Sequence, residues 1–270
     1  MKTIYCYLMS GLLAAHCMST VKAESIDLHI MAGQSNMQGW SSNAKSYPAD
    51  PKKLDIQIPF YFEAVDYSSS QRFWDNLRPQ EGHFLKGHFG PEVTFARSAM
   101  QYGFRPAIFK FSFGSSSIET VWKSPGQNGL YDRMIRELKL SVSLLQKMGK
   151  QVNISSFTWI QGEADASNDI LASHYYVNLK RMLNHFRNVV ARNPSLPVIL
   201  GVDEQHPHVK LRPQVVQAQQ RLAKENNNTA YTTMYGLEKS DVTHLTAQGV
   251  MKHGDRIFQA YLGLAYQETF

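Results

Sequence analysis

The residues with the clearest chemical potential are one serine near the start of the chain and an aspartate and a histidine near its end. Ser35 follows the alternating apolar run 26–33, which is how a buried strand can present a nucleophile in a loop. Asp241 lies three residues before His244, so its carboxylate can accept from Nδ1 and leave Nε2 as a base for a serine hydroxyl. Each pattern alone has an ordinary alternative, namely a simple turn after a strand and an aspartate capping a turn beside a surface histidine.

The elements that must position these residues alternate along the chain. Apolar runs predict strands at 26–33, 107–113, 152–160, 196–202 and 230–234. Apolar stripes with suitable end residues predict helices at 91–103, 130–148, 169–191, 213–225 and 246–266. Such alternation implies a parallel sheet that is covered by helices on both faces. Because ligands bind outside the carboxyl ends of parallel strands, we expect the polar segments after these strands to meet at one edge.

A long irregular region at about 38–90 separates the first predicted strand from the first predicted helix. It contains four prolines together with repeated serine and glycine. A connection of this length inside a compact domain is usually functional or carries small structure of its own. We therefore expect a loop-rich insertion on the substrate side, where aromatic residues such as Trp40 offer faces for sugar rings. The alternative for each aromatic side chain is an ordinary place in the core.

The first 23 residues have the pattern of a secretory signal peptide, with Lys2, an apolar stretch and small residues before a cut after Ala23. The apolar stretch is shorter than the roughly 20 residues of a membrane span. Cys17 follows His16 instead of the small residue of a lipid-attachment site, so no membrane anchoring is expected. We predict a signal peptide at 1–23, one domain at 24–270, and a secreted or periplasmic location.

Composition excludes several other classes of function. Both cysteines lie in the predicted signal peptide, which removes disulfides and thiolate catalysis from the remainder. The formal net charge is +6 without any basic run, so nucleic acid is not an expected partner. The segment His206-Pro207-His208 contains metal-binding residue types without the spacing of a metal site. We expect neither a metal ion nor a cofactor.

Six sequence blocks join these observations into one pattern. In chain order they are Gly33-Gln34-Ser35-Asn36-Met37, Gly90-Pro91-Glu92 with Phe95-Ala96, Gly114 with Ile118 and Trp122, Leu130-Tyr131, Trp159-Ile160-Gln161-Gly162-Glu163-Ala164-Asp165, and Asp241-Val242-Thr243-His244. Over most of the chain they resemble the sialate O-acetylesterase type domain, which includes carbohydrate esterase family six and is a branch of the SGNH hydrolase superfamily. The resemblance implies the SGNH hydrolase fold, an α/β fold with a flavodoxin-like three-layer α/β/α sandwich and a central parallel sheet of about five strands.

The resemblance also implies roles for individual residues. Ser35 would be the nucleophile, His244 the general base and then acid, and Asp241 the group that orients the histidine. Glu163 is a possible second acidic partner, because some relatives are described with a carboxylate there.

An oxyanion hole would combine the N–H of Ser35 with the N–H of Gly114 and the side chain of Gln161. Here Gly114-Ser115-Ser116 departs from the usual Gly-Gly-Thr, so Ser115 is an alternative to Gly114.

Taken together, these features predict a secreted serine esterase that removes O-acetyl groups from a carbohydrate through an acetyl-enzyme. The partner would be an acetylated oligo- or polysaccharide, either of acetylxylan or of sialic acid type. We expect Gln34, Asn36, Trp40 and Trp122 to contribute to substrate binding, although Gln34 and Asn36 have the alternative of holding the turn in shape. Two other functions remain open: an SGNH lipase or thioesterase with another acyl preference, and a non-catalytic carbohydrate-binding protein.

Overall fold

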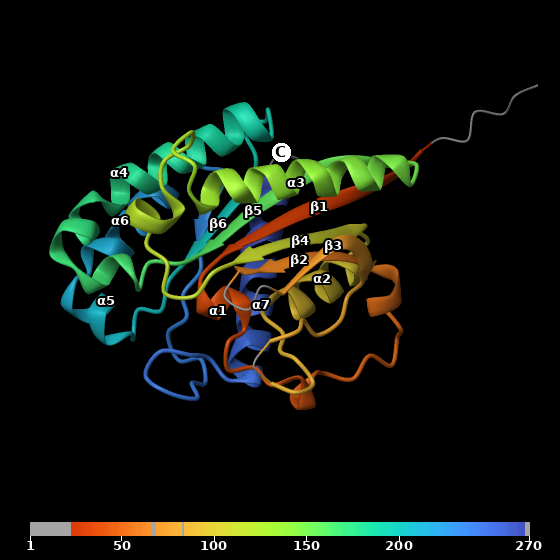
Figure 1. Cartoon of the computed structure of the whole chain (residues 1–270), viewed down its shortest axis with the longest axis horizontal. Coiled ribbons are helices and arrows are strands. Elements are labelled where there is room, and N and C mark those ends of the chain that lie inside the picture. The colour runs from red at the N-terminus through yellow and green to blue at the C-terminus, as the bar shows by residue number, and fades with distance from the viewer. Residues whose placement is uncertain (1–22, 66–68, 83, 268–270) are drawn as a thin grey trace, which may run out of the picture.

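The computed structural model describes residues 23–65, 69–82 and 84–267, which build one central sheet with helices on both faces (Figure 1). Apart from Ala23, the predicted signal peptide lies outside the described residues. Among the helices in these ranges, none is long and apolar enough to cross a membrane.

Seven strands form the sheet within the described ranges, in the order β3-β2-β4-β1-β5-β6-β7. Their bounds are β1 (Glu24–Gly33), β2 (Pro59–Ala64), β3 (Ser69–Asn76), β4 (Pro106–Ser112), β5 (Lys150–Ile160), β6 (Val198–Gly201) and β7 (Thr229–Tyr231). Neighbouring strands run parallel, except that β2 and β3 pair antiparallel at one edge. The sheet is larger than the five strands expected, because β2 and β3 lie inside the region predicted to be loop-rich. A proline opens β2, and the first residue of a strand is a position that tolerates proline.

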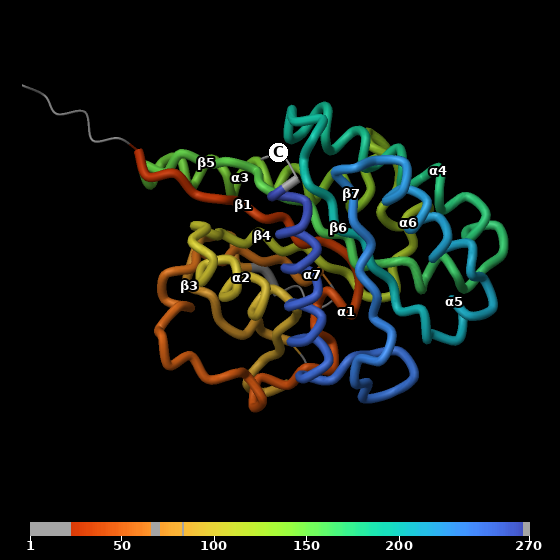
Figure 2. The backbone as a smooth tube through the Cα atoms, turned by 180° about the vertical axis from the view of Figure 1, so that it is seen from behind, coloured from red at the N-terminus to blue at the C-terminus, as the bar shows by residue number. Residues whose placement is uncertain are grey.

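Helices cover the two faces of the sheet and enclose two apolar clusters (Figures 1 and 2). One face carries α3, α4 and α6, and the other carries α2 and α7. The bounds are α1 (Ser35–Gln38), α2 (Glu92–Gln101), α3 (Leu130–Lys147), α4 (Asp169–His185), α5 (Pro207–Leu211), α6 (Gln214–Glu225) and α7 (Ala247–Gln267). Single turns of 3-10 helix occur at Ala44–Ser46, Asp55–Gln57 and Asp165–Ser167, and π-helical turns at Ile118–Trp122 and Phe186–Val190.

Strand β1 lies at the centre of the sheet, between β4 and β5. Leu28 and Ile30 are buried in the cluster under α3 and α4, whereas Met31 is buried in the cluster under α2 and α7. A strand buried on both faces is typical of a parallel sheet. The last residue of β1, Gly33, pairs with Ser112 of β4 and with Ile160 of β5. The loops that follow these three strands therefore begin side by side.

The predicted three-layer α/β/α sandwich is confirmed, and each helix and strand predicted from periodicity has a counterpart in the structure. The segment predicted as one helix at 169–191 divides into α4 and the π-helical turn Phe186–Val190. Sequence periodicity missed α1 and α5, because helices of one turn are too short to show an apolar stripe.

Candidate active site

Ser35 stands at the tip of the central strand, as the first residue of α1. The turn into α1 passes so close to β5 that a Cβ on Gly33 would lie 2.0 Å from the carbonyl oxygen of Ile160. Only glycine fits this approach, and the N–H of Gln34 donates to the same carbonyl at 3.0 Å. Ser35 is 4% exposed and lines a cavity. The fold thus fixes the serine in a rigid turn at the carboxyl edge of the sheet.

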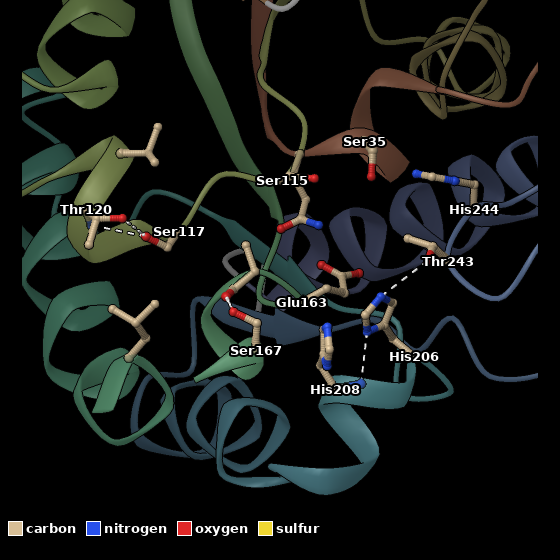
Figure 3. Close-up of a pocket in the computed structure, with 14 residues that line it drawn as sticks. Ser35, Ser115, Ser117, Thr120, Glu163, Ser167, His206, His208, Thr243 and His244 are labelled. Atoms are coloured by element: carbon tan, nitrogen blue, oxygen red, sulfur yellow. Dashed lines mark hydrogen bonds between the residues drawn. The ribbon is translucent and has the colours of Figure 1, made fainter. Parts of the chain in front are cut away.

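His244 and Asp241 lie in the loop that precedes α7. Nδ1 of His244 is 2.9 Å from Oδ2 of Asp241, and Oδ1 of Asp241 accepts the N–H of His244 at 2.7 Å. Because a carboxylate only accepts, the imidazole proton belongs on Nδ1, and Nε2 keeps its lone pair. The imidazole points toward Ser35 (Figure 3). Although burial alone would raise the pKa of Asp241, hydrogen bonds from the His244 side chain and nearby N–H groups lower it below its usual value.

The side chain of Asn36 joins the serine turn to the histidine loop. Its amide nitrogen donates to the carbonyl of Thr243 at 3.0 Å, and its oxygen accepts the N–H of Leu245 at 3.0 Å. These two backbone groups flank His244, so one amide holds the histidine from both sides. Asn36 is 2% exposed. The structure therefore favours the alternative that Asn36 holds the loops in shape over the expectation that it binds substrate.

The cavity that contains Ser35 has a volume of about 480 Å³ and opens at the carboxyl ends of the strands (Figure 3). Its walls come from the loops after β1, β4, β5 and β6, from α4 and α5, and from the histidine loop. The lining residues are Gln34, Ser35, Ser115, Ser117, Thr120, Val121, Glu163, Ala164, Ser167, Leu171, His206, His208, Thr243 and His244. Most of them carry hydrogen-bonding groups, which suits a polar ligand.

Two neighbouring positions after β4 were predicted to supply a backbone donor. Ser115 lines the cavity beside Ser35, whereas Gly114 is not among the lining residues. The backbone of Ser115 has a φ of 50°, in the left-handed region that non-glycine residues rarely adopt. This geometry favours Ser115 over Gly114 as the residue that faces a bound ester.

Gln161 lies behind the cavity wall and is fully buried. Its amide nitrogen donates to the carbonyl of Ser116 at 2.8 Å and to Oδ2 of Asp165 at 2.5 Å. Asp165 also accepts the N–H of Ile118 at 2.9 Å. Both hydrogens of the Gln161 amide are thus engaged in joining the loops after β4 and β5. The structure thus places Gln161, which was expected to donate to an oxyanion, as a link between these two loops.

The carboxylate of Glu163 is hydrogen-bonded to Asp203 and not to His244. Oε1 of Glu163 accepts the N–H of Asp203 at 3.0 Å, and the residue is 2% exposed at the cavity wall. Burial raises the pKa of Glu163 to about 7. Among the described residues, Asp241 is the carboxylate that the structure places on the imidazole of His244.

The residues expected to bind sugar separate into two groups. Gln34 lines the cavity, and Trp40 stacks beside His244 with ring centroids 5.9 Å apart. Trp122 is fully buried, and its indole N–H donates to Ser116 Oγ at 2.8 Å. The structure thus places Trp122, which was expected to contact substrate, in the core, where its ring packs edge-on against Trp159.

The cavity includes two histidines to which the sequence reasoning gave no role. His206 and His208 follow β6, and their position after a predicted strand was the available signal. Nδ1 of His206 accepts the N–H of His208 at 3.2 Å, and its Nε2 lies 3.4 Å from Thr243 Oγ1. Burial lowers the pKa of His206 to about 4, so its ring is neutral near pH 7. Within the described ranges, no group of three or more histidine, cysteine or acidic side chains is arranged to hold a metal ion.

Comparisons with known proteins identify the family and the fold of the chain. Residues 25–263 match the family described as "Carbohydrate esterase, sialic acid-specific acetylesterase". A protein from Arabidopsis thaliana superposes with a TM-score of 0.66 at 22% identity, covering 87% of this chain and 97% of that one. NanS superposes with a TM-score of 0.64 at 14% identity, covering 91% of this chain and 99% of its own.

A carbohydrate acetylesterase from Xanthomonas citri has a TM-score of 0.58 at 20% identity, with 90% of this chain and 57% of that chain covered. At these identities the three structures share the fold with this chain. A comparison with curated protein sequences gives no match.

Proposed function

Because the chain belongs to the sialic acid-specific acetylesterase family of carbohydrate esterases, we propose that it is a serine esterase that removes O-acetyl groups from an acetylated carbohydrate. One observation carries the proposal. Ser35 and His244 line the same cavity, and Nδ1 of His244 is hydrogen-bonded to Asp241. A hydroxyl, a base and a carboxylate in this order are the groups that acyl transfer to serine requires.

In the first half of the reaction, Ser35 Oγ attacks the acetyl carbonyl carbon while Nε2 of His244 takes the hydroxyl proton. The imidazolium that forms is stabilised by Asp241, whose carboxylate is ionised at neutral pH. The bond between the carbonyl carbon and the sugar oxygen then breaks, and His244 returns the proton to that oxygen. The products are a deacetylated sugar and an acetyl group on Ser35.

The negative charge on the carbonyl oxygen needs donors that are already in place. The N–H of Ser35 lies in the first turn of a helix, where backbone N–H groups have no intrahelical acceptor. We assign the second donor to the N–H of Ser115, which belongs to the cavity wall. Each such donor is worth on the order of 3 kcal/mol in the transition state.

In the second half, water attacks the acetyl-enzyme while His244 again accepts a proton. Acetic acid leaves and gives its proton to solvent to become acetate, and Ser35 recovers its hydrogen from the imidazolium. The groups of the chain and one water account for every proton moved, so the route uses no cofactor.

The direct test is acetate release from acetylated xylan, O-acetylated sialic acids and other acetylated glycans by the wild-type protein and by Ser35→Ala. We expect release from at least one glycan and its loss in the variant. Retained release in Ser35→Ala would overturn the serine mechanism. Rates on aryl acetate and aryl octanoate separate the alternatives: a higher rate on octanoate would favour a lipase or thioesterase, and glycan binding without any turnover would favour a binding protein.

We also propose that the protein is exported. The support is the composition of residues 1–23, in which a basic residue, an apolar stretch and small residues follow one another. The N-terminal residue of the protein recovered outside the cytoplasm is the measurement, and Glu24 is the expected result.

A further inference from the structure

The cavity is much larger than an acetyl group. Its volume of about 480 Å³ lies within the roughly 300–1,000 Å³ of pockets that hold whole small molecules. Ser35 and His244 occupy one side, and Figure 3 shows Glu163 between them and the imidazoles of His206 and His208. The space beside Glu163 can therefore take part of the sugar that bears the ester.

Two side-chain oxygens in this wall have no hydrogen-bond partner at normal distance and angle among the described residues, although the Asn36 side chain lies near enough to the Glu163 carboxyl to lower its pKa. They are Oε2 of Glu163 and Oε1 of Gln34, and both residues are at least 97% buried. A buried oxygen without a donor costs free energy, so native proteins satisfy nearly all of them. Two unpaired acceptors in one cavity indicate a ligand that brings hydrogen-bond donors.

The position of the Glu163 carboxylate is fixed by the fold. Its Oε1 accepts the N–H of Asp203 at 3.0 Å. The preceding residue, Gly162, has a φ of 152° and is packed so tightly that a Cβ would lie 2.7 Å from Val215. The free oxygen is therefore preorganised, as a specificity contact requires.

The neighbouring histidine does not supply the missing donor. The N–H of His208 donates to Nδ1 of His206, so the ring proton of His206 lies on Nε2 and is directed to Thr243 at 3.4 Å. A sugar hydroxyl suits the free oxygen in both protonation states, which are accessible because burial raises the pKa of Glu163 to about 7. A hydroxyl donates to the ionised carboxylate and accepts from the neutral acid, whereas a ligand carboxylate pairs with the neutral acid alone.

Resting on the esterase function proposed above, we propose that Oε2 of Glu163 binds a free hydroxyl of the sugar ring that carries the acetyl ester. Glu163 is then a specificity-determining residue. It selects partly acetylated sugars over esters that have no free hydroxyl beside the cleavage site.

The test compares two substrates in one enzyme preparation. The first is a monoacetylated methyl pyranoside with free hydroxyls, and the second is its analogue with the remaining hydroxyls methylated. The ratio of the two kcat/KM values is independent of the fraction of folded enzyme. In Glu163→Met, which removes the acceptor and keeps the volume, we expect this ratio to fall about 10- to 100-fold, the worth of one hydrogen bond to a charged group.

Glu63 on β2 offers a matched control. It is also buried, pairs with Arg133 through one oxygen, and leaves the other oxygen without a partner among the described residues. Glu63→Met should lower stability and leave the ratio unchanged. Should Glu163→Met fail to fold, Glu163→Gln still loses the charge, and its ratio should fall about 3- to 10-fold. An unchanged ratio in the folded Glu163 variant overturns the proposal, including the case in which both rates fall equally.

A binding measurement separates this inference from the proposed function. In the Ser35→Ala background, the monoacetylated pyranoside should bind about tenfold more weakly when Glu163→Met is added. If the wild-type protein releases no acetate while this difference is present, the esterase function fails and the hydroxyl contact stands. If the esterase is active while the two affinities are equal, the contact is refuted.

Discussion

Replacement of Asn36 by alanine tests whether the serine turn and the histidine loop act as one unit. The side chain makes two hydrogen bonds, one to the carbonyl of Thr243 and one from the N–H of Leu245, each at 3.0 Å. The second of these is buried, so its loss leaves a backbone N–H without a partner. The two bonds hold the residues on either side of His244.

The size of the effect follows from these two contacts. A typical hydrogen bond contributes about 0.5–1.5 kcal/mol, so removing both costs about 1–3 kcal/mol. If this loss is expressed as misplacement of His244, kcat falls about 5- to 150-fold with little change in KM, since Asn36 contacts the loop and not the substrate. The free energy of unfolding should fall by a similar amount.

Two further variants make the measurement decisive. Asn36→Asp keeps an acceptor for Leu245 but places an oxygen against the carbonyl of Thr243, so it should be no better than alanine. Asn153→Ala is the matched control, because this exposed asparagine donates to Ser25 at the opposite end of β1 and β5. Steady-state kinetics on an aryl acetate and urea unfolding are the assays. A wild-type kcat in Asn36→Ala would refute the reasoning. A kcat in Asn36→Asp above that of Asn36→Ala would refute it as well.

Three other predictions concern charge. Asp241→Asn should lower kcat on the order of 10²- to 10⁴-fold, because the amide no longer stabilises the His244 imidazolium; an unchanged kcat would show that another group does so. Lys110→Met leaves the buried Glu92 carboxylate without its ion-pair partner, so the free energy of unfolding measured in urea should fall by about 3–5 kcal/mol. The double variant Lys110→Met with Glu92→Leu should regain much of this lost stability.

Burial lowers the pKa of His29 and of His253 to about 3 in the folded protein. As pH falls below about 6.5, these two histidines therefore take up protons in the unfolded chain but not in the folded one. Stability should therefore fall as pH drops from about 6.5 toward 3, by up to about 1.4 kcal/mol per pH unit for each histidine. His253→Leu should flatten this slope in urea unfolding measured between pH 7 and pH 5, and an equal slope would contradict the assignment.

Much of the architecture could be predicted because its signals are local. The strands and helices from 91 onward follow from apolar periodicity and from proline and glycine at their ends. The parallel sheet then follows from their alternation, and with it the gathering of Ser35 and the 241–244 segment at one edge. The strands β2 and β3 escaped prediction because serine and proline around them resemble loop sequence, and because β2 joins the sheet by pairing with β4, which lies more than 40 residues further along the chain.

In the candidate site, too, contacts between residues close in sequence could be predicted and contacts between distant segments could not. Asp241 and His244 are three residues apart, so their contact is a matter of local geometry and the sequence determined it. What Gln161, Trp122 and Glu163 contact depends on loops that arrive from other strands. Burial and hydrogen-bond partners are properties of those neighbours, and the tertiary structure alone decided that Trp122 packs in the core and that one oxygen of Glu163 stays unpaired at the cavity.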